Sequence, residues 1–93
     1  MKETVMLEIP NVFEKEKPTI ATLSRTFNID ASRFNGYQPV PMFRKAAAEK
    51  RAVTAQDRPD SYILLVDHDT AAVIDAKLQG RTTVWSNPPI QPS

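Results

Sequence analysis

The only histidine of the chain, His68, stands between two acids in the run Asp67-His68-Asp69. An imidazole beside carboxylates is a set of groups that acid–base catalysis and many metal sites use. Adjacent residues on a bend point in different directions, however, and the chain has no cysteine and no second histidine to complete a set of ligands. The sequence therefore favours a hairpin turn over residues 67–70 and predicts no metal site.

Other kinds of catalytic site also lack essential parts. A Ser-His-Asp arrangement needs an oriented histidine and an oxyanion hole, and a chain with two glycines offers little for the tight turns involved. The sequence has no glycine-rich loop of the kind that cradles phosphates. Its acidic residues alternate with lysines or fall in expected loops, where they are ordinarily solvated. We therefore predict a protein that is not an enzyme and needs no cofactor.

Basic residues gather in the middle of the chain. Between Arg25 and Arg58 there are seven basic residues and three acidic ones, an excess that suits an anionic partner. The sequence pI of about 8.1 is lower than the value above about 9 that is typical of dedicated nucleic-acid-binding domains. Nucleic-acid binding is thus the alternative hypothesis, with the candidate residues Arg25, Arg33, Arg44, Lys45, Arg51 and Arg58.

Protein–protein binding is the leading hypothesis, because elimination of catalytic groups and the small size both favour it. An inhibitor, an adaptor and an accessory subunit are the kinds of protein that fit. Large apolar side chains near a proline-rich end are typical of contact residues, and exposed strand edges invite pairing with a partner or a second copy. The candidate partner-binding residues are Trp85, Ile90 and Tyr37.

The elements that must position these residues begin with a strand over 4–9, rich in β-branched side chains and ended by Pro10. Residues 61–85 predict a three-stranded meander, with turns at 67–70 and at Gln79-Gly80. A helix over 70–78 is the alternative to its middle strand. One helix is expected at about 41–55, because Pro41 suits the first helical position and three alanines follow it.

Residues 19–35 allow two interpretations. Alternation of apolar and polar side chains favours a strand over 20–29. A helix-turn-helix over 19–35 is the alternative, in which Asp30 caps a short second helix. Because that second helix would have only about five residues, it would be short for DNA recognition.

The sequence thus predicts an α+β fold in which the N-terminal strand and the C-terminal meander form a small antiparallel sheet, covered on one face by the single main helix at 41–55. Residues 1–86 are expected to form one domain, and 87–93 an extended proline-rich tail. No secretory signal begins the chain and no run of about 20 apolar residues occurs in it. A cytoplasmic protein without a membrane segment is therefore expected.

Overall fold

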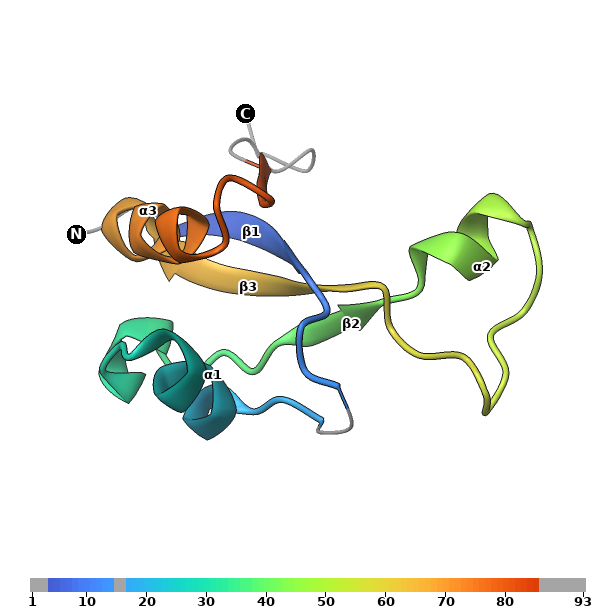
Figure 1. Ribbon diagram of the computed structural model, residues 1–93, viewed down its shortest axis with the longest axis horizontal. Coiled ribbons are helices and arrows are strands. Elements are labelled where there is room, and N and C mark those ends of the chain that lie inside the picture. Colours follow the sequence, from blue (N-terminus) through green and yellow to red (C-terminus); the bar gives the residue numbers. More distant parts are fainter. Residues whose placement is uncertain (1–3, 15–16, 86–93) are drawn as a thin grey trace, which may run out of the picture.

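The computed structural model describes residues 4–14 and 17–85, and these form a small sheet with helices (Figure 1). The class is α+β and the sheet is antiparallel, as predicted. The elements in chain order are β1 (Thr4–Pro10), α1 (Ile20–Phe27), the 3-10 helix η1 (Ala31–Phe34), β2 (Val40–Met42), α2 (Arg44–Ala48), β3 (Ser61–Asp67), α3 (His68–Lys77) and β4 (Thr83–Trp85).

The sheet has the strand order β2-β3-β1-β4, and each neighbouring pair is antiparallel. Strands β3 and β4 therefore run in the same direction on either side of β1, with α3 as the connection between them. Together with α1 between β1 and β2, this is the split β-α-β connectivity called ferredoxin-like. Proteins with many unrelated functions share this topology. The edge strands are β2 and β4.

The core lies on one face of this sheet. Alternate residues of β1 and β3 pair directly across the strands, as Leu7 does with Leu64, and both are buried. Buried side chains from α1, η1 and α3 belong to the same cluster, including Leu23, Phe34 and Ile74. Both main helices therefore cover the same face, and the predicted single covering helix at 41–55 is wrong.

Residues 20–27 form a helix, so the strand predicted over 20–29 is wrong. Thr19 and Thr22 cap the first turn reciprocally, each side chain accepting a hydrogen bond from the other residue's backbone amide. Asn28 ends the helix in the left-handed conformation at φ 55°. Of the helix-turn-helix alternative, only the first helix is present in the structure. Its second segment is the four-residue η1, whose Phe34 is buried in the core.

Residues 68–77 also form a helix, so the middle strand of the meander and the hairpin turn at 67–70 are wrong. Asp67 is the N-cap of α3 and accepts a hydrogen bond from the amide of Thr70 at 2.7 Å. Ala71, Ile74 and Leu78 then recur at helical spacing and are buried against the sheet. The predicted strands on either side are confirmed as β3 and β4.

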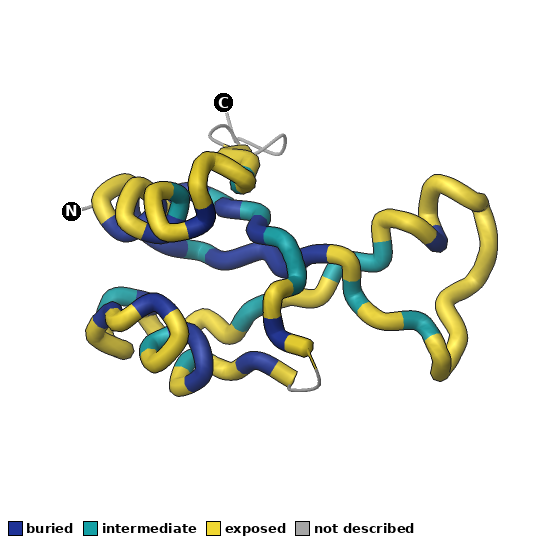
Figure 2. Tube along the Cα trace, viewed as in Figure 1, coloured by how far each residue is buried: buried dark blue, intermediate teal, exposed yellow. Residues whose placement is uncertain are grey.

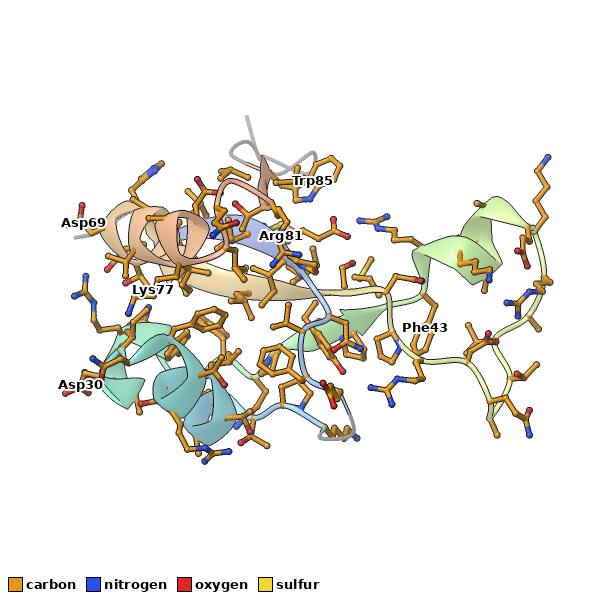
Figure 3. The ribbon with its side chains drawn as sticks, viewed as in Figure 1. Asp30, Phe43, Asp69, Lys77, Arg81 and Trp85 are labelled. Carbon is orange, nitrogen blue, oxygen red and sulfur yellow. The ribbon has the colours of Figure 1, made fainter. Side chains whose placement is uncertain are left out.

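Two polar contacts join α3 to the other helical segments on the same face of the sheet. Arg33 of η1 donates from Nε to the hydroxyl of Thr70 at 3.1 Å. Lys77 donates from Nζ to the carbonyl of Phe27, the last residue of α1. Figure 3 shows Lys77 reaching from α3 towards α1. These contacts fix the two helices side by side over the sheet.

We predict that Asp67→Ala lowers the free energy of unfolding by about 1–2 kcal/mol, because the buried amide of Thr70 loses its acceptor. Chemical denaturation followed by circular dichroism measures this change. Asp67→Asn keeps an acceptor at the same position and is the matched control. Equal losses for the two variants would contradict a capping role.

The helix expected over 41–55 is reduced to α2, because residues 40–42 pair with β3 as an edge strand. An edge strand tolerates Pro41, which has no N–H to donate. Lys50 takes a left-handed φ of 55° directly after the helix ends. The segment 43–60, called here the arm, then projects beyond the sheet and is exposed over most of its length (Figure 2).

The predicted tail at 87–93 lies outside the described residues. Within residues 4–14 and 17–85, no helix combines the length and the apolar character needed to cross a bilayer.

Candidate functional site

The face of the sheet opposite the core, called here the open face, is built from the alternate residues of each strand. Strand register places Trp85, Met6 and Leu65 in one row across β4, β1 and β3. Met6 and Leu65 are partly exposed, and Trp85 is 45% exposed. Because α1 and α3 pack on the other face, this apolar row is left accessible to a partner.

A polar cluster is centred on Glu8, which lies in the next row of the open face. Glu8, near the middle of β1, accepts two hydrogen bonds from the Arg44 guanidinium at 3.0 and 2.8 Å. It also accepts from the hydroxyl of Ser61 and from the indole N–H of Trp85 at 3.1 Å. The guanidinium carbon of Arg44 lies 5.9 Å from the centroid of the Trp85 ring, within the range of a cation–π contact.

This cluster bridges the whole sheet. Arg44 follows β2, and its partner Glu8 is in β1, so the arginine side chain must cross β3, which lies between them. Trp85 reaches the same carboxylate from β4 on the other side. The crossing arginine also explains why Ser61 is buried although it lies on the open face. The cluster is called here the Glu8 clamp.

The clamp has an electrostatic consequence. Bidentate bonding to Arg44, with further hydrogen bonds from Ser61 and Trp85, lowers the pKa of Glu8 to about 2 against the partial burial of the carboxylate. The same contact raises the pKa of Arg44. Glu8 therefore stays ionised at any physiological pH and acts as a fixed anchor for the two side chains that flank it.

The structure places the predicted partner-binding residues apart. Trp85 belongs to the edge strand β4, whereas Tyr37, 51% exposed, precedes the opposite edge strand β2. Ile90 lies outside the described residues. Only Trp85 therefore joins the apolar row of the open face.

The predicted basic surface is divided among several places. Arg44 is held by Glu8, and Arg33 bonds Thr70. Arg51 lies beyond the end of α2 and bonds Asp57 and Glu49 instead. Lys45 is exposed on α2 and Arg25 on α1, which lie on different elements. Arg44 and Arg51 therefore do not share the face of one helix, as the helix predicted at about 41–55 would require.

The arm is organised by one carboxylate. Asp57 accepts two hydrogen bonds from Arg51, at 2.8 and 2.9 Å, and two more from the backbone amide and hydroxyl of Thr54. These contacts lower the pKa of Asp57 and raise that of Arg51. This local turn competes with helix formation, which explains why α2 stops before residue 50.

His68 is the first residue of α3 and is exposed. Its neighbour Asp67 caps the helix, and Asp69 lies in the first turn. In the described part of the chain, no three histidine, aspartate or glutamate side chains come together as a metal site requires.

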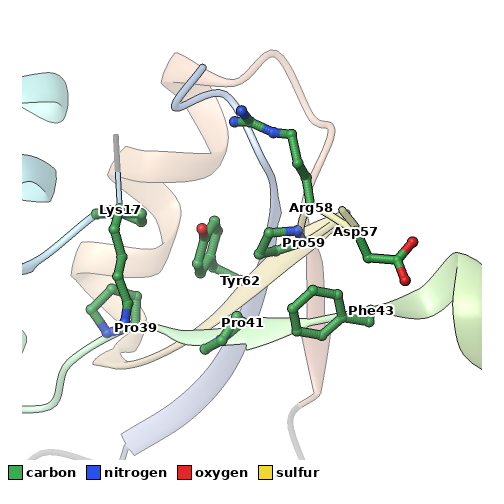
Figure 4. A pocket seen from close by; sticks show the side chains of 9 residues that line it. Lys17, Pro39, Pro41, Phe43, Asp57, Arg58, Pro59 and Tyr62 are labelled. Atoms are coloured by element: carbon green, nitrogen blue, oxygen red, sulfur yellow. The ribbon is translucent and has the colours of Figure 1, made fainter. Parts of the chain in front are cut away.

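A second feature lies on the core side of the sheet, at the base of the arm. It is a hollow of about 330 Å³, called here the proline hollow (Figure 4). Phe43 forms one side, and the ring of Tyr62 forms the floor, where Phe13 holds it edge-on at 5.8 Å between centroids. Prolines from three separate segments complete the apolar lining: Pro18, Pro39, Pro41 and Pro59.

Charged side chains border this hollow. Lys17 and Arg58 line it, as does Asp57, whose carboxylate points away from Tyr62 in Figure 4 and is bonded to Arg51. Burial raises the pKa of Tyr62, while the charge of Arg58 opposes the shift. The hollow thus combines an aromatic floor with a cationic border.

No protein-family model, curated protein or solved structure matches this chain.

Sequence analysis did not predict either the Glu8 clamp or the proline hollow. The clamp joins Glu8 to Arg44, which is 36 positions away in the sequence, and to Trp85, which is 77 positions away. Contacts over such separations leave no local sequence pattern. The alternation in β1 does place Glu8 on the face opposite the core, and this was the one sequence signal that pointed to the place of Glu8. Among the prolines of the hollow, Pro41 was predicted to begin a helix, and none was predicted to line a binding site.

Proposed function

We propose that this protein acts by binding another protein through the open face of its sheet, as an inhibitor, adaptor or accessory subunit. The observation that carries the proposal is the row Trp85, Met6 and Leu65, which is apolar, accessible and continuous across three strands. Tryptophan at the edge of such a row is the residue type most often found at the energetic centre of protein interfaces. The proposed site of action is the cytoplasm.

The polar groups of this face also suit a protein partner. Glu8 has its bonds satisfied by Arg44, Ser61 and Trp85 before any partner arrives. A partner can therefore cover the clamp without leaving a buried charge unpaired, which is the costly outcome at an interface. Since Arg44 and Trp85 are already held in place, little side-chain entropy is lost on binding.

A nucleic-acid partner is the weaker alternative for this face. Sheets that bind single-stranded RNA stack bases on aromatic residues of their central strands. Here the central strands present Met6, Glu8 and Leu65 instead, and none of these is aromatic. Two of the candidate arginines, Arg44 and Arg51, are paired with carboxylates.

We predict that Leu65→Lys weakens partner binding at least about tenfold, because a charge enters the apolar row at its β3 end. Tagged protein is recovered from its native cells, the partner is identified by mass spectrometry, and the purified pair is titrated by calorimetry. Trp85→Ala is expected to weaken binding to a similar degree. Val73→Lys is the matched control, since Val73 is an exposed valine on α3 and α3 packs on the opposite face.

Equal loss of binding in Leu65→Lys and Val73→Lys, with both variants folded, would place the partner elsewhere. Unchanged binding by both Leu65→Lys and Trp85→Ala would contradict the proposal. So would a purified protein that stays monomeric and recovers no partner at all.

A further inference from the structure

We propose that the proline hollow binds a small aromatic anion, that is, an aromatic ring carrying a carboxylate or a phosphate. This site is separate from the open face, because Tyr62 and Pro41 belong to the core side of the sheet. It would hold a low-molecular-weight ligand of its own, whatever protein the open face binds.

The lining selects for a flat apolar group. Proline has no backbone N–H, so the four prolines present carbon and hydrogen to a ligand and offer few donors of their own. Phe43 is partly exposed at the side of the hollow and is available for an offset or edge-on contact with a ring. The volume of about 330 Å³ lies at the small end of ligand sites, which suits a single ring and one substituent.

The border selects for negative charge. Arg58 lines the hollow and donates from Nη2 to the carbonyl of Phe13 at 3.2 Å, so that its guanidinium extends away from Phe43 and Pro41 at the border of the hollow (Figure 4). Among the described residues, Lys17 and Arg58 have no carboxylate within ion-pair distance. Two cationic residues from separate segments thus line one apolar hollow.

The third charged group does not cancel this attraction. Asp57 is bonded to Arg51 and to Thr54, and its carboxylate is turned away from the hollow (Figure 4). The three charged residues that line the hollow, Lys17, Arg58 and Asp57, give a net charge of +1. A ligand with a negative charge is therefore complementary to it.

The test is a titration of the full chain labelled with ¹⁵N, followed by amide chemical shifts. Phenyl phosphate and benzoate supply a ring with a charge, benzyl alcohol a ring alone, and inorganic phosphate a charge alone. We expect the two ring anions to bind with a dissociation constant of about 1 mM, shifting the amides of Phe43, Arg58 and Tyr62. Benzyl alcohol and phosphate are each expected to bind at least about tenfold more weakly.

Variants test which residues bind the charged group of the ligand and which bind its ring. Lys17→Gln and Arg58→Gln are expected to weaken the binding of the ring anions about tenfold and to leave the binding of benzyl alcohol unchanged. Phe43→Ala is expected to weaken the binding of all three ring compounds. Arg81→Gln is the matched control, because the exposed Arg81 also donates to a backbone carbonyl, that of Leu78, and lies far from Phe43 in Figure 3.

Three results would overturn the proposal. The first is the absence of shifts at the hollow up to about 10 mM ligand. The second is equal binding of inorganic phosphate and phenyl phosphate, which would mean an adventitious ion only. The third is ring-anion binding that survives both Lys17→Gln and Arg58→Gln. None of these outcomes bears on the open face, whose variants are different residues.

Discussion

Phe34→Ala is expected to lower the free energy of unfolding by about 3–5 kcal/mol. Phe34 is the largest of the fully buried side chains, with 1% of its surface exposed, and it carries η1 onto the core beside β3. Removing its ring leaves a cavity that a close-packed core fills only in part. For a 93-residue domain, this is a large share of a total stability of about 5–10 kcal/mol.

Urea denaturation followed by tryptophan fluorescence and circular dichroism measures the loss. Tyr37→Ala is the matched control, since Tyr37 lies three residues further along the same connection but is 51% exposed; its expected cost is within about 0.5 kcal/mol. A cost for Phe34→Ala below about 1 kcal/mol would mean that η1 does not pack on the sheet as described.

The second large effect concerns the Glu8 clamp. Glu8→Gln is expected to destabilise the protein by about 2 kcal/mol at pH 7, because the charge-assisted bonds from Arg44 are lost and its guanidinium is left without a counter-charge. The Glu8 side chain is 13% exposed and that of Arg44 is 49% exposed, so solvent screens this interaction in part and the expected loss is smaller than for a fully buried ion pair.

The clamp also makes stability depend on pH in a direction that follows from the pKa. The pKa of Glu8 is about 2 in the folded protein and 4.5 when unperturbed, so the folded state holds this proton less tightly. The stabilisation is therefore fully present above pH 4.5 and is lost as the pH falls towards 2. The difference between wild type and Glu8→Gln should accordingly shrink between pH 5 and pH 3.

Denaturation curves at pH 7, 5, 4 and 3 measure this difference. Glu14→Gln is the control, because Glu14 is exposed and no ion pair to it is found among the described residues. A constant difference between wild type and Glu8→Gln over the whole range would contradict the proposed role of the carboxylate. The same samples report the clamp through Trp85, whose indole fluorescence should change when the carboxylate that accepts its N–H loses its charge.

The two helices that sequence analysis predicted as strands share one physical cause. Both α1 and α3 are short, with 8 and 10 residues, and each carries β-branched or aromatic residues that suit a strand. Intrinsic propensity is a weak guide at this length, since packing supplies most of the stability of such helices. The signals that favoured helix were the spacing of Leu23 and Phe27, and of Ile74 and Leu78, together with the caps at Thr19 and Asp67.

The opposite error occurred at residues 41–55. Alanines and a favourable proline predicted a long helix, but most of that segment has no surface on which to bury a face, since Ala46 alone is buried in α2. Pairing of Val40–Met42 with β3 and the bonding of Arg51 to Asp57 replace helical contacts at either end.

The sequence by itself determined the α+β class, the strands predicted at 4–9 and from residue 61 up to the expected turn at 67–70, and the lack of any thiolate chemistry, because these depend on local composition and on residues that are present or absent. Only the tertiary structure decided that residues 20–27 and 68–77 are helices on one face, and that Arg44 and Trp85 meet at Glu8 on the other. The reason is that both outcomes depend on contacts between residues far apart in the chain, which exist only once the sheet has formed. The place of His68 changed for the same reason, from a turn residue to the first residue of the helix that Asp67 caps.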